Sequence, residues 1–180
     1  MRPVPVCSPH HTGTSIDVTM AGTAELVARA LDGRAIACAE SCTAGRICEA
    51  LATVTGASDW FRGGVVAYQE PVKRALLDVE AASVLSEQAA AEMATGVAEL
   101  LEADVSVATT GVAGDEPIDG VDPGTVFIAT CVGGSVRVAM HRFDGDPVAV
   151  CESASDCALT SLLAHLRSEG GRPRIPGSRV

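Results

Sequence analysis

The chain has 180 residues, of which 47% are hydrophobic, and its formal net charge at pH 7 is −10. This length and composition exclude a disordered chain and indicate one folded domain with a core of its own. The negative charge disfavours binding to nucleic acid or to an anionic membrane surface.

The two ends of the chain differ in composition from the rest. Residues 1–20 contain several prolines and no periodic apolar pattern, and residues 168–180 are rich in Gly, Pro and Arg. We therefore expect a loose N-terminal leader, one domain over residues 21–167 and a flexible tail. The leader lacks the apolar stretch of a signal peptide, and no apolar run reaches about 18 residues, which favours a cytoplasmic protein without a membrane span.

Helical and strand patterns alternate in the first half of the domain. Apolar residues recur at helical spacing in two segments, short apolar runs are typical of buried strands, and Pro71 stands where the first residue of a short helix belongs. In chain order, the sequence predicts a helix over residues 22–31, a strand over 35–39, a helix over 44–54, a strand over 63–68 and a helix over 71–77.

The second half ends in a hairpin and a helix. Ser86 is expected to cap a helix that runs to about residue 102, and Gly133-Gly134 predicts a tight turn between antiparallel strands. The other predicted elements are strands over 104–109, 124–131 and 135–142 and a helix over 147–166. This order predicts an α/β fold, a three-layer α/β/α sandwich with a mixed sheet between helices.

The seven cysteines show no pattern of a disulfide framework or a metal site. Their number is odd, and none stands in a Cys-x-x-Cys pair or at zinc-finger spacing from histidines. We expect buried free thiols in a reducing compartment and no metal.

The segment Ala39-Glu40-Ser41-Cys42-Thr43-Ala44-Gly45 joins a predicted strand to a predicted helix. Ligands of open α/β sheets bind at the carboxyl ends of strands, and unpaired N–H groups at a helix start can hold a phosphate or an oxyanion. A serine placed there can attack a carbonyl carbon. The alternative is that Ser41 or Thr43 only caps the helix.

A second candidate segment contains Tyr68, Glu70 and Lys73 at the start of the short helix. The helix dipole disfavours a positive charge at that end and should lower the pKa of Lys73, so that its neutral amine can act as a general base. Glu70 opposes this effect. The alternative is an ordinary surface lysine.

The third candidate segment places Thr110, Gly111 and Gly114 directly after a predicted strand, where backbone N–H groups can approach a phosphate. A plain turn is the alternative. Four carboxylates follow within eight residues, and a solvated acidic loop is favoured there over a weak cation site. These are Asp115, Glu116, Asp119 and Asp122.

Several hydrolytic motifs are missing, among them Gly-x-Ser-x-Gly, His-Glu-x-x-His and Ser-x-x-Lys. Two of the four histidines lie in the leader and one lies near the tail. His141 alone lies within a predicted strand, where a core or surface role is favoured. A Ser-Lys arrangement is thus favoured over a Ser-His-Asp triad.

Taken together and in order, these segments resemble the C-terminal domain family of the competence/damage-inducible protein CinA, whose stand-alone members, called PncC, are nicotinamide mononucleotide amidohydrolases. The strongest match is residues 39–45 against the family pattern Ala-Glu-Ser-Cys-Thr-Gly-Gly. The resemblance covers roughly residues 22–166. Further matches lie at residues 56–58, 61, 64–68, 73–79, 110–114, 123–126 and 143–146.

The resemblance implies hydrolysis of a small nucleotide substrate, nicotinamide mononucleotide, to nicotinate mononucleotide and ammonia, without a cofactor or metal, by a homo-oligomer. It implies that Ser41 is the nucleophile, that Lys73 is the base and that Tyr68 assists proton transfer. Cys42 is a less favoured nucleophile. The implied substrate-binding residues are Glu40, Cys42, Thr43, Gly45, Thr110, Gly111 and Gly114.

The sequence departs from the family pattern at positions that bear on phosphate recognition. Glu70 replaces Asn, an acidic segment replaces a Gly-rich loop at 115–119, and Pro147 and Val150 replace two arginines. Lost arginines and gained carboxylates weaken phosphate binding. The departures leave open an altered amide substrate or a pyridine-nucleotide-binding module without catalysis.

Overall fold

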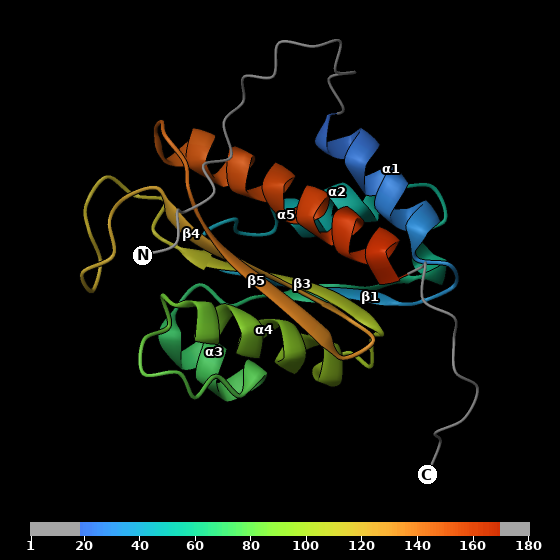
Figure 1. Ribbon diagram of the computed structural model, residues 1–180, viewed down its shortest axis with the longest axis horizontal. Coiled ribbons are helices and arrows are strands. Elements are labelled where there is room, and N and C mark those ends of the chain that lie inside the picture. Colours follow the sequence, from blue (N-terminus) through green and yellow to red (C-terminus); the bar gives the residue numbers. More distant parts are fainter. Residues whose placement is uncertain (1–18, 170–180) are drawn as a thin grey trace.

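The computed structural model describes residues 19–169, which form three layers (Figure 1). The strands are β1 (Ile36–Glu40), β2 (Phe61–Val66), β3 (Val105–Gly111), β4 (Thr125–Val132) and β5 (Ser135–Arg142). The helices are α1 (Met20–Ala30), α2 (Arg46–Ala52), α3 (Glu70–Leu77), α4 (Glu87–Leu100) and α5 (Pro147–Glu169), and a 3₁₀ turn, Ala57–Asp59, precedes β2.

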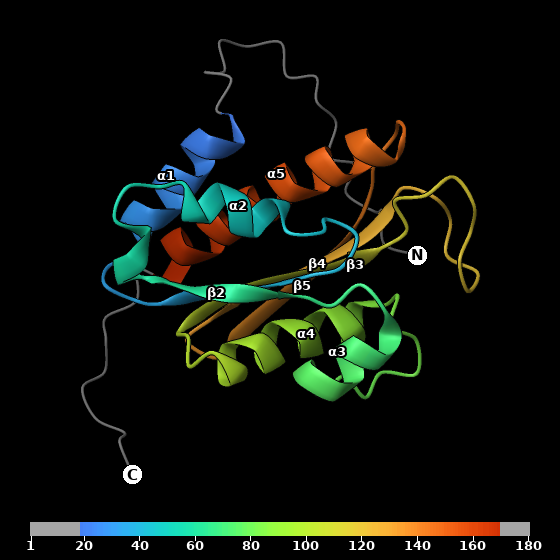
Figure 2. The same ribbon diagram turned by 180° about the vertical axis from the view of Figure 1, so that it is seen from behind.

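Helices cover both faces of the sheet. Helices α1, α2 and α5 lie on one face, and α3 and α4 lie on the other (Figures 1 and 2). Side chains of β1 alternate between two apolar clusters: Ile36 and Cys38 pack with α1, α2 and α5, whereas Ala37 and Ala39 pack with α4. The predicted three-layer α/β/α sandwich is therefore confirmed.

The sheet is mixed, with strand order β2-β1-β3-β4-β5. Strands β1, β2 and β3 are parallel, and β4 and β5 each run antiparallel to their preceding neighbour. Because parallel strands end at the same edge, the segments that follow Glu40, Val66 and Gly111 begin side by side. This edge is where open α/β sheets bind ligands.

Two local predictions from the sequence are confirmed. The Ser86 hydroxyl accepts a hydrogen bond from the Ala89 N–H at 3.1 Å and caps α4. Strands β4 and β5 form the predicted hairpin, and both residues of its Gly133-Gly134 turn have positive φ, which glycine adopts without strain.

Three element boundaries differ from the sequence predictions at the edge just described. Helix α2 begins at Arg46 rather than at residue 44, because Ala44 and Gly45 both have left-handed φ angles. Strand β3 continues to Gly111, which pairs with Val126, so Thr110 and Gly111 belong to the strand and not to a loop. Strand β2 ends at Val66, which leaves Tyr68 in the connection to α3.

Helix α1 begins within the expected leader and α5 continues two residues into the expected tail; residues 1–18 and 170–180 lie outside the described residues. Between residues 19 and 169, no helix is long and apolar enough to cross a membrane. The six cysteines in that range are free thiols, whereas Cys7 lies outside it.

Candidate active site

Ser41 and Lys73 meet at the carboxyl edge of the sheet. Ser41 follows β1, Lys73 belongs to α3, and the Lys73 Nζ lies 2.9 Å from the Ser41 Oγ. Both side chains are buried, with exposed fractions of 5% for Ser41 and 2% for Lys73. Two residues that are 32 positions apart in sequence are thus within hydrogen-bonding distance, as a nucleophile and its base require.

Lys73 is the only lysine in the chain. Burial lowers its pKa below the ordinary 10.5, although Cys42 and Glu70 act in the opposite direction. The amine also donates a hydrogen bond to the Tyr68 carbonyl oxygen at 3.1 Å. A neutral amine that donates one N–H to this carbonyl still has a lone pair to accept the Ser41 proton.

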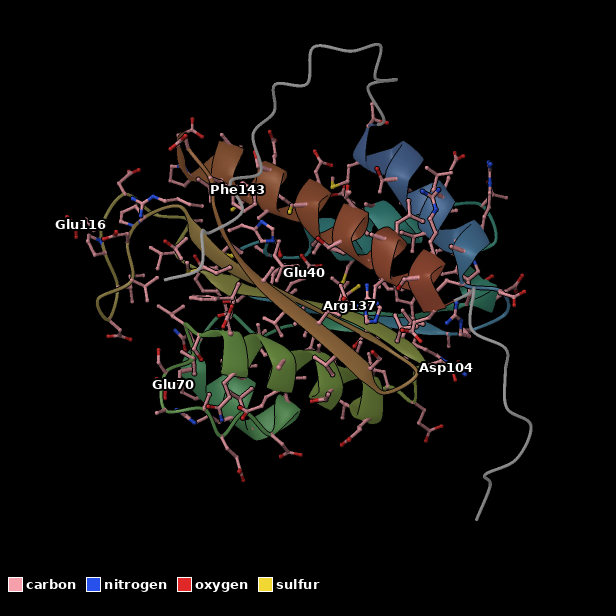
Figure 3. The ribbon with its side chains drawn as sticks, viewed as in Figure 1. Glu40, Glu70, Asp104, Glu116, Arg137 and Phe143 are labelled. Atoms are coloured by element: carbon pink, nitrogen blue, oxygen red, sulfur yellow. The ribbon has the colours of Figure 1, made fainter. Side chains whose placement is uncertain are left out.

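We call residues 41–45 the serine turn. A buried carboxylate, Glu40, holds this turn and the start of α2. Its Oε1 accepts from the Cys48 N–H at 2.8 Å, and its Oε2 accepts from the Gly45 N–H at 2.9 Å and the Ile47 N–H at 3.2 Å. The Glu40 carboxylate lies between the sheet and the upper helices (Figure 3). Because Glu40 uses these amides, they do not face a substrate phosphate.

Glu40 is also linked to β3 through two threonines. The Thr43 hydroxyl donates to the Glu40 Oε2 at 2.7 Å and lies 2.8 Å from the Thr109 hydroxyl. The Ser41 N–H donates to the Thr109 carbonyl oxygen at 3.0 Å. Thr109 was not among the residues that the sequence marked for the site, because its contribution is to hold the turn.

Two backbone N–H groups of the serine turn have no acceptor in the described part of the chain. Within residues 19–169, the Cys42 and Thr43 N–H groups donate to no other group, whereas the Ala44 N–H donates to the Ser41 carbonyl oxygen. Thr43 is fully buried, whereas Cys42 keeps 7% of its surface exposed. The Cys42 N–H directly follows the nucleophile and is suited to stabilise an oxyanion that forms on a carbon attacked by Ser41.

Of the three binding residues expected after β3, Thr110 and Gly111 serve the fold and Gly114 lies in the open. The buried Thr110 hydroxyl donates to the Val84 carbonyl oxygen at 2.8 Å. A Cβ on Gly111 would collide with the Thr125 carbonyl oxygen, so glycine permits the close approach of β4. Gly114 is exposed, and no atom lies within 4 Å of the position of an added Cβ.

Cys42 packs in the apolar cluster with α1, α2 and α5 and is poorly suited to nucleophilic attack. Burial raises the pKa of its thiol to about 12, so the thiolate is scarce at neutral pH. Its carbonyl oxygen accepts a hydrogen bond from the Cys151 S–H at 2.9 Å. The electrostatics favour Ser41 over Cys42 as the nucleophile.

Tyr68 contributes its backbone, not its hydroxyl, to the Lys73 environment. The side chain is 68% exposed, and the hydroxyl has no hydrogen-bond partner in the described part of the chain. The proton-transfer role expected for this residue therefore has no contact in this geometry that would carry it.

The acidic segment after β3 projects from the edge of the sheet, with Glu116 far from the layers (Figure 3). Its base is held by an ion pair of 2.9 Å between Asp122 and Arg142, and Ile118 pairs with Val121 near its tip. Nowhere in residues 19–169 do three or more His, Cys, Asp or Glu side chains gather to hold a metal ion.

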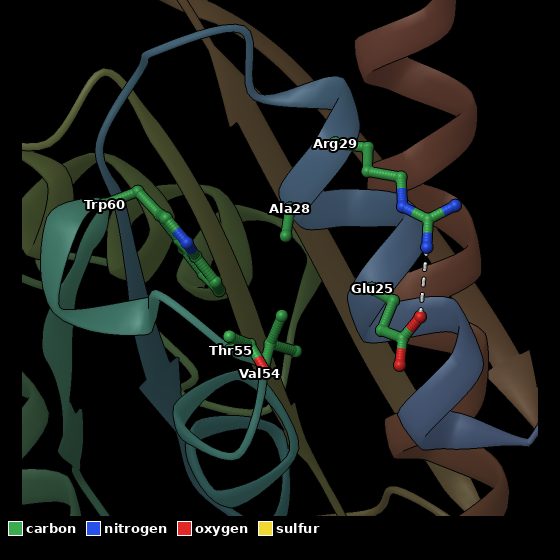
Figure 4. Close-up of a pocket in the computed structure, with 6 residues that line it drawn as sticks. All are labelled: Glu25, Ala28, Arg29, Val54, Thr55 and Trp60. Carbon is green, nitrogen blue, oxygen red and sulfur yellow. Dashed lines mark hydrogen bonds and ion pairs between the residues drawn. The ribbon is translucent and has the colours of Figure 1, made fainter.

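A pocket of about 420 Å³ lies elsewhere, against α1 (Figure 4). Trp60 lines it and directly precedes β2, whereas Ser41 follows the parallel strand β1. The pocket is therefore near the opposite edge of the sheet, and the Ser41–Lys73 contact identifies the candidate active site better than the cavity does. The pocket is lined by Glu25, Ala28, Arg29, Val54, Thr55 and Trp60.

Comparisons with known proteins cover most of the chain. A family model described as the CinA C-terminal domain matches residues 20–166. Protein YdeJ of Escherichia coli K12 is 37% identical over 86% of this chain and 90% of its own length. The nicotinamide-nucleotide amidohydrolase PncC of Enterobacter agglomerans is 37% identical over 71% of this chain and 82% of its own length.

The fold matches solved structures as well. A CinA superfamily protein from Klebsiella pneumoniae superposes with a TM-score of 0.80 at 34% identity, over 83% of this chain and 99% of that protein. The chain spans only 34–38% of the length of several other curated relatives that it matches.

Proposed function

Because the chain belongs to the CinA C-terminal domain family, we propose that it is an amidohydrolase that converts nicotinamide mononucleotide to nicotinate mononucleotide and ammonia. The contact of 2.9 Å between the buried Lys73 amine and the Ser41 hydroxyl carries this proposal. The 37% identity to a relative named as a nicotinamide-nucleotide amidohydrolase supplies the substrate.

In the first half of the reaction, the Ser41 Oγ attacks the carboxamide carbon while the neutral Lys73 amine takes the hydroxyl proton. The Cys42 N–H, which donates to no other group in the described residues, holds the resulting oxyanion. When the intermediate collapses, the C–N bond breaks and the Lys73 ammonium gives its proton to the nitrogen, which leaves as ammonia. An ester of Ser41 with the nicotinate group remains.

In the second half, water attacks the ester carbon and Lys73 takes the proton of the water. The C–O bond to Ser41 then breaks, the serine oxygen takes the proton back, and the nicotinate product is released. Lys73 thus ends neutral, as it began, and the cycle consumes one water and one amide.

The test is ammonia release from nicotinamide mononucleotide by the wild type and by Ser41→Ala. We expect Ser41→Ala to lower kcat by roughly 10⁴-fold or more. Ser58→Ala, which changes an exposed serine in the 3₁₀ turn, is the matched control and should keep wild-type activity. Full activity of Ser41→Ala would refute the assignment, and loss in Cys42→Ala alone would transfer it to the thiol.

A pyridine-nucleotide-binding module without turnover is the second candidate. The carboxylate of Glu70, one turn before Lys73 in the same helix, favours it because this charge stabilises the ammonium form of the base. Calorimetry with nicotinamide mononucleotide beside the ammonia assay separates the two. Binding with no ammonia from the wild type would establish the module.

A further inference from the structure

Tyr68 is the only tyrosine in a chain with five aromatic residues, and its side chain is exposed although its backbone carbonyl contacts Lys73. At 68%, it has a higher exposed fraction than any other large apolar side chain in residues 19–169. Leaving most of a large aromatic side chain in water forgoes free energy that its burial would gain. Tyrosine is enriched at binding interfaces because it combines a large apolar ring with a polar hydroxyl.

The backbone fixes where this ring starts. The Ala67 N–H donates to the Glu40 carbonyl oxygen at 2.8 Å, and the Tyr68 carbonyl oxygen accepts from the Lys73 Nζ. That nitrogen in turn lies 2.9 Å from the Ser41 Oγ. The Tyr68 backbone is therefore anchored one hydrogen bond away from the catalytic amine, while its side chain remains outside.

Val66 indicates which side of the edge Tyr68 faces. Side chains of an extended segment alternate, so Val66 and Tyr68 share one side and the buried Ala67 takes the other. The Val66 Cγ2 lies 3.7 Å from the position of a Cβ on Gly45, so this side adjoins the serine turn. Val66, itself 48% exposed, and Tyr68 thus both leave apolar surface uncovered on the side of β2 that adjoins the serine turn.

We propose that the Tyr68 ring binds the ring of the substrate by stacking and selects a cationic pyridinium carboxamide; this inference rests on the proposed function. The face of an aromatic ring is electronegative and attracts a cation. A pyridinium ring combines a flat apolar surface with a positive charge, which also suits a chain of net charge −10. Tyr68 is then a specificity-determining residue that acts through its ring, not through its hydroxyl.

The test compares Tyr68→Phe and Tyr68→Ala with the wild type, using nicotinamide mononucleotide as substrate. Tyr68→Phe should keep kcat and KM within about twofold, because it retains the ring. Tyr68→Ala should raise KM roughly 3- to 30-fold and change kcat little. Leu100→Ala, at the end of α4 and 49% exposed, is the matched control for loss of an exposed apolar side chain.

A binding measurement separates this inference from the proposed function. Calorimetry in the Ser41→Ala background, with cationic 1-methylnicotinamide and neutral nicotinamide, should show a preference for the cation that Tyr68→Ala removes and Tyr68→Phe keeps. That result would support the inference even if the wild type released no ammonia. Equal binding of both ligands by all variants, or a large loss of kcat in Tyr68→Phe, would overturn it.

Discussion

Two segments follow neighbouring parallel strands at the same edge of the sheet, and they are held very differently. The serine turn after β1 is buried, and Glu40, Thr43 and Thr109 fix it through side-chain hydrogen bonds. Residues 67–69 after β2 are held by backbone contacts, and the side chains of Tyr68 and Gln69 are exposed. The two segments are therefore suited to different roles. The serine turn positions the reacting oxygen, and residues 67–69 are free to contact a ligand.

Replacing Lys73, the base that acts on Ser41, should slow the reaction and leave the structure of the serine turn intact. We expect Lys73→Met to lower kcat by about 10²- to 10⁴-fold, because no neutral amine then accepts the Ser41 proton. The measurement is the rate of ammonia release at saturating substrate. Retained activity would show that another group takes the proton.

The same variant makes a prediction about stability. Burial lowers the pKa of Lys73 in the folded chain below the ordinary 10.5, so the unfolded chain binds more protons between the two pKa values. Wild-type stability should therefore rise with pH through that interval. Urea unfolding of Lys73→Met should lack this rise, and an identical pH dependence in both proteins would contradict the burial effect.

The second-largest effect should come from loosening the serine turn. Glu40→Gln puts amide N–H groups where the carboxylate accepts bonds from Gly45, Ile47 and Cys48, so we expect unfolding to cost about 2–3 kcal/mol less. The displaced Ser41 should lower kcat by roughly 10²-fold with KM little changed. Urea titration and steady-state kinetics measure the two effects.

Glu99→Gln is the control for Glu40→Gln, because Glu99 is exposed near the end of α4. It should leave both stability and kcat unaltered. If Glu40→Gln also left the stability and kcat unaltered, the buried carboxylate would not be what holds the serine turn. The contrast between the two segments would then be refuted.

The smallest effect should be a shift in the pH dependence of kcat/KM when Glu70 is replaced. Glu70 raises the pKa of Lys73, so Glu70→Gln should lower that pKa further and move the acid limb of kcat/KM to lower pH. Glu70 is also paired with Arg74 at 2.7 Å, and Glu25→Gln, which breaks the similar exposed pair with Arg29 in α1, is the matched control. An acid limb of kcat/KM that stays in place or moves to higher pH in Glu70→Gln would contradict the prediction.

Periodicity and capping residues predicted the elements well, because they depend on neighbours in sequence. The Ser86 cap and the hairpin at Gly133-Gly134 are examples. The pairing of Ser41 with Lys73 depends on where α3 packs. The residues favoured a Ser-Lys arrangement, and the resemblance to a family assigned the two roles. Spacing alone left a surface lysine open for Lys73.

The sequence did not indicate that Glu40 accepts hydrogen bonds from backbone N–H groups at the start of α2. A carboxylate followed by Ser-Cys-Thr does not indicate burial, and a cap is normally sought directly before a helix. Here Gly45 has a left-handed φ and no side chain, so a residue five positions earlier satisfies the helix amides. The start of α2, which was predicted two residues too early, has the same cause.

The single lysine has a practical consequence for following the site in solution. A lysine-specific endoprotease has one bond to cut in this chain, after Lys73, and that side chain is 2% exposed within α3. Cleavage requires α3 to open, so the rate at which two fragments appear reports the opening of the site directly. A ligand that binds only the closed form should slow the cut in proportion to its occupancy, which turns proteolysis into a binding assay without any label.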